Sequence, residues 1–178
     1  MLNETSDEAL MENFRQGDAA ALEALFTRHA RGVHGFLVRM VRDDALADDL
    51  LQQTFMSVVR SVDRFERGAR VWPWLLTIAA NAARGTLRHQ RHGVEVLGET
   101  PGHEPSVNPS PSDPGARKQI EAAFAAMPAS QREAVLLHKV EGLSFDEIGA
   151  MLGISSTAAR IRAHRGYEFL RPLLEGLS

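Results

Sequence analysis

Two helix-start signals on either side of a single glycine constrain this chain more than any other feature of its sequence. Ser144 is followed three residues later by Glu147, which is the spacing of a capping box that starts a helix. Gly153 interrupts the apolar pattern that follows, and Ser155 or Ser156 is placed to cap a second helix directly after it. Two short helices separated by a tight glycine turn are typical of a helix-turn-helix.

The second of these helices is expected to carry basic residues on its outer face. Its predicted interior positions are Ala158, Ile161 and Ala163, and its predicted outer positions are Arg160, Arg162, His164 and Arg165. Such a helix fits the DNA major groove, where arginine reaches phosphates and the O6/N7 edge of guanine. The three arginines do not share one face, so we expect Arg162 to hold the turn through a salt bridge to Glu147. An amphipathic hairpin with a solvated basic face is the alternative interpretation.

The composition suits a cytoplasmic protein with a packed core. The 178 residues allow one domain or two small ones, and a hydrophobic content of 44% is ample for burial. No stretch approaches a membrane span, and the first ten residues lack the basic start and apolar run of a secretory signal. Because the chain has no cysteine, it has neither disulfides nor a cysteine-based zinc or redox site. We expect a cytoplasmic location without membrane insertion.

The formal net charge of -3 is unevenly distributed. Residues 1–59 contain 5 Lys/Arg and 10 Asp/Glu, whereas residues 60–91 contain 7 Lys/Arg and 2 Asp/Glu. Neutralisation of phosphates normally supplies most of a protein's affinity for DNA. An acidic chain with one basic segment is therefore expected to bind free duplex weakly and to need a partner.

Apolar residues recur at helical spacing along the chain, and no segment alternates like a strand. We predict an all-α fold with two small helical domains joined by a flexible linker. Residues 1–91 are the first domain, and residues 92–115, rich in proline, glycine and serine, are the linker. Residues 116–178 are predicted to form a four-helix domain that contains the helix-turn-helix.

Local signals place the individual helices and their inner faces. In the first domain, helices are predicted over 7–16, from a cap at Asp18 to about Val41, from about Asp44 to Val62, and from the first turn at Pro73 onward. The second helix is expected to bury Leu22, Leu25, Phe26, Val33, Phe36, Leu37, Met40 and Val41. In the second domain, a helix is predicted over 117–126, Ser130 and Glu133 suggest a second capping box, and Pro172 is expected to end the last helix.

The third helix opens with four aspartates, Asp43, Asp44, Asp48 and Asp49. Acidic residues near a helix N-terminus are favoured by the helix dipole, so simple dipole stabilisation on a solvated face is one interpretation. An acidic docking surface continued by Gln52 and Gln53 is a second. Metal binding is a third and weak alternative, because the sequence places no histidine cluster beside these carboxylates.

The fourth helix combines a buried stripe with a polar and basic ridge. The ridge residues recur at steps of three, four and three and are Asn81, Arg84, Arg88 and Arg91. Arginines beside a loop that contains aromatic residues are typical of single-stranded nucleic-acid binding, with a solvated face as the alternative. We expect Trp74 to lie in the core and Trp72, next to the loop over 65–71, to meet DNA.

The order of these parts resembles the extracytoplasmic-function group of bacterial RNA polymerase sigma factors, which keep the second and fourth conserved sigma regions joined by a linker. The resemblance is carried by LEALFTRHARGVHGFLVRMVRDDALADDLLQQTFMSV, WLLTIAANAARGTLRHQR and MPASQREAVLLHKVEGLSFDEIGAMLGISSTAARIRAHRG. It covers nearly the whole chain, and the order and spacing of these segments are specific although no single motif is.

The resemblance implies three binding surfaces. The surface that grips the polymerase clamp helices would include Asp48, Asp49, Leu51, Gln52, Gln53 and Phe55. The minus-ten promoter element, with a base flipped from the stack, would be recognised by Arg67, Arg70, Val71, Trp72, Asn81, Arg84 and Arg88. The minus-thirty-five element would be read as duplex by Ser156, Thr157, Arg160, Ile161, His164 and Arg165.

The resemblance also implies the partners and the absence of chemistry. Core RNA polymerase, promoter DNA and an anti-sigma factor are the expected partners, with no catalytic residue, metal or cofactor. One alternative is a helix-turn-helix regulator that binds duplex operators as a dimer, independently of polymerase. Another is a hydrolase that uses the aspartates near residue 48 with His29 or His34, although no nucleophile motif or phosphate loop supports it.

Overall fold

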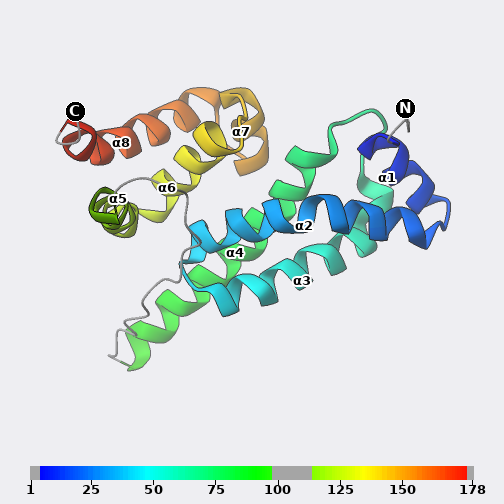
Figure 1. Ribbon diagram of the computed structural model, residues 1–178, viewed down its shortest axis with the longest axis horizontal. Coiled ribbons are helices and arrows are strands. Elements are labelled where there is room, and N and C mark those ends of the chain that lie inside the picture. The colour runs from blue at the N-terminus through cyan, green and yellow to red at the C-terminus, as the bar shows by residue number, and fades with distance from the viewer. Residues whose placement is uncertain (1–4, 98–113, 176–178) are drawn as a thin grey trace. The chain divides into compact units, whose positions relative to one another are not determined.

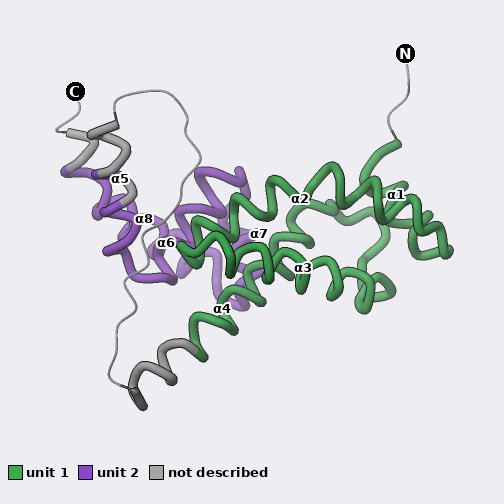
Figure 2. The backbone as a smooth tube through the Cα atoms, turned by 60° about the horizontal axis from the view of Figure 1, so that its bottom comes forward, with its two compact units in different colours: residues 1–105 green, residues 106–178 purple. Residues whose placement is uncertain are grey.

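The computed structural model describes residues 5–97 and 114–175, with the side chains of 90–97, 114–118, 121 and 173–175 left out of the description. Helices alone make up the regular structure of the described residues, which confirms the predicted all-α class. The chain divides into two compact units, residues 1–105 and residues 106–178 (Figure 2). In the described segments, no helix is long and apolar enough to span a bilayer.

The predicted linker falls mainly on residues 98–113, which lie outside the described residues. The helix before it continues to Leu97, so the first six residues of the predicted linker are helical. The helix after it begins at Pro114. The division into domains at 91 and 116 stays a prediction.

The first unit contains α1 (Asp7–Arg15), α2 (Ala19–Val41), α3 (Asp44–Ser61), the 3-10 turn η1 (Val62–Arg64) and α4 (Val71–Leu97). Helices α2, α3 and α4 pack against one another, and α1 packs on α2 (Figure 1). The first three helices begin where a side chain accepts a backbone N–H of the first turn, at Ser6, Asp18 and Asp43. These caps fix where each helix starts and therefore which face it buries.

The inner face of α2 is buried largely as predicted, with Leu25, Val33, Phe36, Leu37 and Met40 in the core. The prediction for Phe26 is wrong, because its side chain is 43% exposed. Its ring meets the ring of Phe55 on α3 edge-on, with 4.8 Å between centroids. Phe26 therefore lies at the margin of the core, where α2 and α3 meet solvent.

The fourth helix begins at Val71, so Pro73 lies in its first turn as predicted. In that turn a backbone N–H has no intrahelical acceptor, and its loss costs nothing. Leu75, Leu76, Ala79, Ala80 and Ala83 are fully buried and form the stripe that faces α2 and α3.

The second unit contains α5 (Pro114–Ala126), α6 (Ala129–Val135), the π turn η2 (Leu136–Val140), α7 (Phe145–Leu152) and α8 (Ser156–Glu175). The predicted capping box is present, because the hydroxyl of Ser144 accepts from the backbone N–H of Glu147 while the Glu147 carboxylate accepts from the backbone N–H of Ser144. Gly153 ends α7 in the left-handed region, at a φ of 65°. Ser155 caps α8 through a 3.1 Å bond from the N–H of Ala158, which decides between the two candidate serines.

Two boundary predictions in this unit are wrong. Pro128, which has no side-chain acceptor, occupies the N-cap of α6, and Glu133 is buried rather than placed in a capping box with Ser130. Helix α8 also continues through Pro172 to Glu175. Pro172 is exposed in the last turn of α8, where a carbonyl that loses its N–H donor can be hydrated instead.

Candidate nucleic-acid interface

The loop between η1 and α4 is anchored at its start and open along its length. Phe65 is buried, and its ring meets that of Trp74 edge-on with 5.1 Å between centroids. Beyond it the N–H of Ala69 donates to the carbonyl of Glu66, and Gly68 adopts a φ of 80°, so the loop turns tightly. Arg67 extends outward with 77% of its side chain exposed and pairs with Glu12 at 3.1 Å. Arg70 is exposed as well.

At the far end of the loop the structure separates two predicted contact residues. Val71 is 1% exposed, so its side chain belongs to the core and cannot meet a nucleic acid directly. Trp72 is half-buried against α2, where its ring stacks on His29 with centroids 5.5 Å apart. A Cβ on Gly32 would lie 2.8 Å from the Trp72 ring, so the absence of a side chain at Gly32 permits the close contact of Trp72 with α2. The expected contrast with Trp74 is absent, because both tryptophans are half-buried.

The polar ridge of α4 follows the loop. Asn81 and Arg88 are exposed and Arg84 is half-buried between them. The Arg84 guanidinium donates to the side-chain oxygen of Asn81 and to the carbonyl of Ala80, which fixes the position of the amide. The side chain of Arg91, the predicted last member of the ridge, lies outside the described residues.

The outward face of α3 is more apolar than the sequence indicated. Its predicted polar members Asp48, Asp49, Gln52 and Gln53 are exposed, Leu51 is half-buried and Phe55 is buried. Met56 and Val59, which were not predicted, are 58% and 48% exposed. They follow Gln52 at helical spacing, off the buried stripe, which is the signal that identifies them. They give this face an apolar part, which follows its acidic part along α3.

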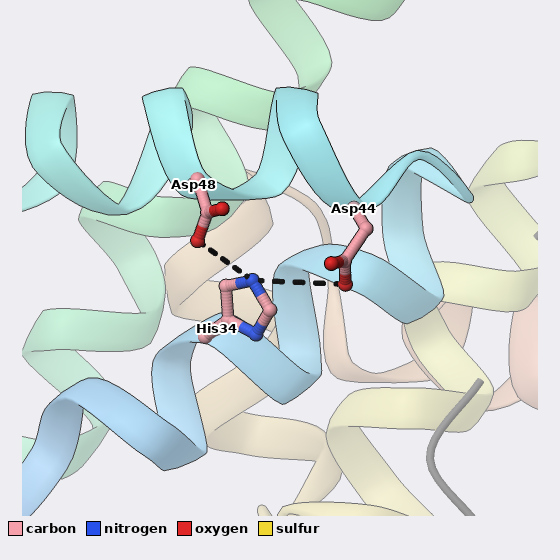
Figure 3. A group of neighbouring side chains, drawn as sticks. All are labelled: His34, Asp44 and Asp48. Atoms are coloured by element: carbon pink, nitrogen blue, oxygen red, sulfur yellow. Dashed lines mark ion pairs between the residues drawn. The ribbon is translucent and has the colours of Figure 1, made fainter. Parts of the chain in front are cut away.

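A histidine and two aspartates meet where α2 and α3 lie together (Figure 3). His34 Nε2 is 3.1 Å from Asp48 Oδ1 and 3.9 Å from Asp44 Oδ1. One donor atom from each residue falls within 4.8 Å of the others, so the donor set itself suits a divalent cation. The two carboxylates are 53% and 67% exposed, which is typical of a surface ion-pair cluster. The sequence showed no histidine beside these aspartates, and for that reason metal binding was a weak alternative. In the structure His34 of α2 lies beside them.

In the second unit, α8 presents a polar face opposite its buried stripe. Ala159, Ala163 and Gly166 are buried against the unit, whereas Thr157 and His164 are exposed. Ile161 is 47% exposed, so its predicted interior position is wrong. A residue must be exposed to contact DNA, and Ile161 meets that condition. Ser156, at the first turn, is half-buried.

The arginines of α8 have different environments from those predicted. Arg160, rather than Arg162, reaches back to α7, with its guanidinium carbon 5.4 Å from the centroid of the Phe145 ring. The carboxylate of Glu147 is engaged by Ser144, and between Glu147 and Arg162, both described, no ion pair is formed. The prediction of a Glu147–Arg162 bridge is therefore wrong.

Arg165 is exposed on the side of α8 that faces α6, beside a groove of about 560 Å³ lined by Gln131, Glu168, Phe169 and Pro172. His164 lies on the outer face, where its Nε2 is 3.7 Å from a Glu168 carboxylate oxygen. Outer residues of α8 are thus reachable by a duplex, although Arg160 and Arg165 flank the face rather than occupy its centre.

Both units match known protein-family models. Residues 25–93 match Sigma-70 region 2, and residues 117–170 match Sigma-70, region 4. The first match covers α3, most of α4 and the loop between them, and the second covers the helix-turn-helix. The match to region 2 begins after α1, at Leu25 within α2.

Full-length similarity extends to characterised relatives. The chain is 57% identical over 165 residues to the RNA polymerase sigma factor CarQ of Myxococcus xanthus, with 92% of this chain and 95% of that protein covered. It is 30% identical over 177 residues to the ECF RNA polymerase sigma factor SigM of Mycobacterium tuberculosis, with 97% and 86% covered.

Solved structures share the fold at lower identity. The sigma factor RpoE of Bartonella quintana, crystallised with the anti-sigma factor NepR, superposes with a TM-score of 0.76 at 23% identity, covering 86% of this chain and 96% of that one. CnrH, solved in complex with the cytosolic domain of CnrY, superposes with a TM-score of 0.71 at 23% identity, covering 97% and 99%.

Proposed function

The chain belongs to the sigma-70 family of RNA polymerase sigma factors, in its extracytoplasmic-function group, and from this membership we propose that it directs core polymerase to a set of promoters. The observation that carries the proposal is the pairing of sigma region 2 and region 4 on two separate helical units, together with similarity to CarQ over nearly the full length of both chains. As a sigma factor it is a binding subunit and contributes no bond chemistry of its own.

The first unit is proposed to recognise the minus-ten element after strand separation. The exposed arginines 67 and 70 flank the turn at Gly68, and Asn81 and Arg88 continue the polar surface along α4. Such a surface suits a single strand, because cationic side chains bind the phosphates and an open loop leaves room for unstacked bases. Val71 would contribute through its backbone and its packing, since its side chain is buried.

The second unit is proposed to read the minus-thirty-five element as intact duplex. Thr157, Ile161 and His164 occupy the outward face of α8, and Arg160 and Arg165 flank it. A recognition helix lies in the major groove with its N-terminal residues at the base edges and flanking cations at the phosphates. Ile161 adds an apolar surface that suits a thymine methyl group.

Docking to core polymerase is assigned to the outward face of α3. The exposed Asp48, Asp49 and Gln52 supply polar contacts, and Met56 and Val59 supply apolar area. Interfaces of this kind combine a desolvated apolar centre with a charged rim that favours one partner. The net charge of -5 over residues 1–59 then serves docking, while core polymerase supplies the non-specific affinity for DNA that the subunit lacks.

An anti-sigma factor and a cytoplasmic location complete the proposal. RpoE of Bartonella quintana, which shares the fold, was solved bound to the anti-sigma factor NepR. A protein that covers the apolar and acidic face of α3 would prevent polymerase from docking there. We propose the same mode of control for this chain, and a cytoplasmic site of action, where polymerase is found.

Run-off transcription with purified core enzyme on genomic fragments tests the proposal. Core plus this subunit should yield discrete transcripts that core alone does not, and their start points would reveal the promoter sequence. The rival regulator function predicts instead a gel shift of duplex fragments by the free protein, at nanomolar concentration and without core. Core-independent binding of that kind, with no new transcripts, would exclude the sigma assignment.

A further inference from the structure

Helix α1 precedes the segment that matches sigma region 2, yet it contacts the start of the loop that is proposed to read the minus-ten element and acts on the far end of that loop through α2. Its apolar face buries Leu10 and Met11 against the unit. Its polar residues make a second set of contacts that packing does not require. These polar contacts converge on the loop between Phe65 and Trp72.

At the start of the loop, Arg15 of α1 binds the backbone. Its Nη2 donates to the carbonyl of Phe65 at 2.5 Å and lies 3.5 Å from the carbonyl of Val62. The Arg15 side chain is only 16% exposed, so these charge-assisted bonds are largely shielded from water. They hold the last turn of η1 and the first residue of the loop in one place.

Glu12, one turn earlier on α1, extends this contact to the loop itself. Its carboxylate pairs with Arg15 at 3.1 Å and with Arg67 at 3.1 Å. Arg67 is otherwise free to sample solvent, because 77% of its side chain is exposed. Glu12 thus orients both the arginine that holds the backbone and the arginine that is proposed to meet the DNA strand.

At the other end of the loop, α1 acts through α2. Asp7 Oδ2 lies 2.8 Å from His29 Nε2, and the His29 ring stacks on Trp72 at an interplanar angle of 25°. The His29 side chain is 12% exposed, so its ring is confined between the carboxylate and the indole. The six-membered ring of Trp72 also lies close to Gly32, where an added Cβ would be 2.8 Å from it.

We propose that α1 is a positioning element for minus-ten recognition, with Arg15 and Asp7 as positioning residues that do not themselves touch DNA. This inference rests on the proposed function of the loop. Holding both ends of the loop before DNA arrives removes ordering costs that binding would otherwise meet. It also keeps the base-reading geometry constant, so that a wrong base is rejected rather than accommodated.

The test compares variants of the full chain, assembled with core polymerase, on the promoter recovered by run-off transcription. Arg15→Ala removes the bonds to both backbone carbonyls at the start of the loop, and Arg15→Lys retains the charge but offers a single nitrogen. Asp7→Asn removes the negative charge beside His29 and so weakens the interaction between residue 7 and the His29 ring. Arg28→Ala is the matched control, because Arg28 also ties α1 through Asp7 and the carbonyl of Thr5 but has no contact with the loop.

The decisive readout is discrimination, measured as the ratio of open-complex formation on the native promoter to that on a promoter with one substituted minus-ten base. Arg15→Ala should lower this ratio about tenfold, the effect of losing one hydrogen bond to a charged group. Arg15→Lys and Asp7→Asn should lower it less, and Arg28→Ala should leave it unchanged. A partly unfolded variant lowers both rates equally and does not change the ratio.

Core affinity and thermal stability are measured in parallel. If Arg15→Ala does not fold, Arg15→Lys and Asp7→Asn provide the same comparison. Unchanged ratios in all three variants, or equal losses in Arg15→Ala and Arg28→Ala, would overturn the role of α1. Absence of promoter-dependent transcripts with the wild-type chain would instead refute the proposed function, so the two failures are distinct.

Discussion

Tyr167 on α8 has a hydroxyl that is buried without a hydrogen-bond partner among the described residues. Burial raises the pKa of the Tyr167 hydroxyl above its ordinary value of 10.0, because the phenolate is poorly solvated there. A group whose pKa is raised by folding supports stability below the pKa of the unfolded chain, and that support is lost as pH rises through the folded pKa. The second unit should therefore lose stability above about pH 10.

Replacing Tyr167 with Phe tests this assignment. Tyr167→Phe removes a desolvated polar group and leaves the ring, so the protein should be equally stable at pH 7 or more stable by up to about 1 kcal/mol. Urea unfolding at pH 7 and near pH 11 should show a smaller loss for the variant at the higher pH. Lysines also titrate near pH 10.4, but they do so in both proteins. A marked loss at pH 7 would reveal a partner for the hydroxyl.

Two helical glycines of opposite environment make a matched pair. A Cβ on Gly166 would lie 2.5 Å from Val135 Cγ2, in the contact between α8 and α6, whereas a Cβ on Gly85 would meet nothing within 4 Å. Gly166→Ala should destabilise the protein by about 1–3 kcal/mol through overpacking. Gly85→Ala should stabilise α4 by up to about 1 kcal/mol through helix propensity. Thermal unfolding distinguishes the two, and equal effects would contradict the close packing of α8.

At the scale of elements, side-chain caps were predictable from the sequence and helix ends were less so. The box at Ser144 depends on residues three apart, and the sequence shows both members. The pattern Ser130–Glu133 is the same, but Glu133 is buried by tertiary packing and the helix starts at Ala129, with Pro128 at its N-cap. The Ser-x-x-Glu spacing alone therefore cannot distinguish a capping box from a pair whose glutamate is buried in the core. Pro172 likewise suggested the end of the last helix, but α8 accommodates this proline in its last turn and continues to Glu175.

The two serines provide a direct test of this distinction. Ser144→Ala should cost about 1 kcal/mol, because the N–H of Glu147 loses its acceptor at the start of α7. Ser130→Ala should be neutral or slightly stabilising, since Ser130 lies exposed within α6 and alanine has the higher helix propensity. Chemical unfolding of both variants measures the difference. A comparable loss at Ser130 would restore the predicted capping box.

At the scale of the whole molecule, the sequence predicted the class of fold but not the contacts between helices. His34 meets Asp48, which is 14 positions later in the sequence, only because α2 and α3 pack at that register. The contacts from Arg15 to the loop join residues 50 apart, which no local pattern can indicate. The exposure of Phe26 and Ile161 has the same cause, since packing partners decide which edge of an apolar stripe is covered.

The separation of the chain into two units leads to a prediction about division of labour. Asp49→Arg places a cation on the acidic face of α3 and should weaken core binding at least tenfold, with little effect on stability because the position is exposed. Arg165→Ala should leave core binding intact and weaken promoter use by about 1–3 kcal/mol if the arginine makes a bidentate base contact. Co-purification with core and run-off transcription at saturating subunit measure the two effects separately.

The double variant decides whether the two surfaces act independently. Because the residues belong to different compact units, their free-energy effects on transcription should add within about 0.5 kcal/mol. Adding excess Asp49→Arg protein should restore its initiation rate, since mass action compensates for weak docking. The same excess should not rescue Arg165→Ala, whose defect persists after the holoenzyme has formed. Normal co-purification of Asp49→Arg with core would show instead that docking uses a different face of the first unit.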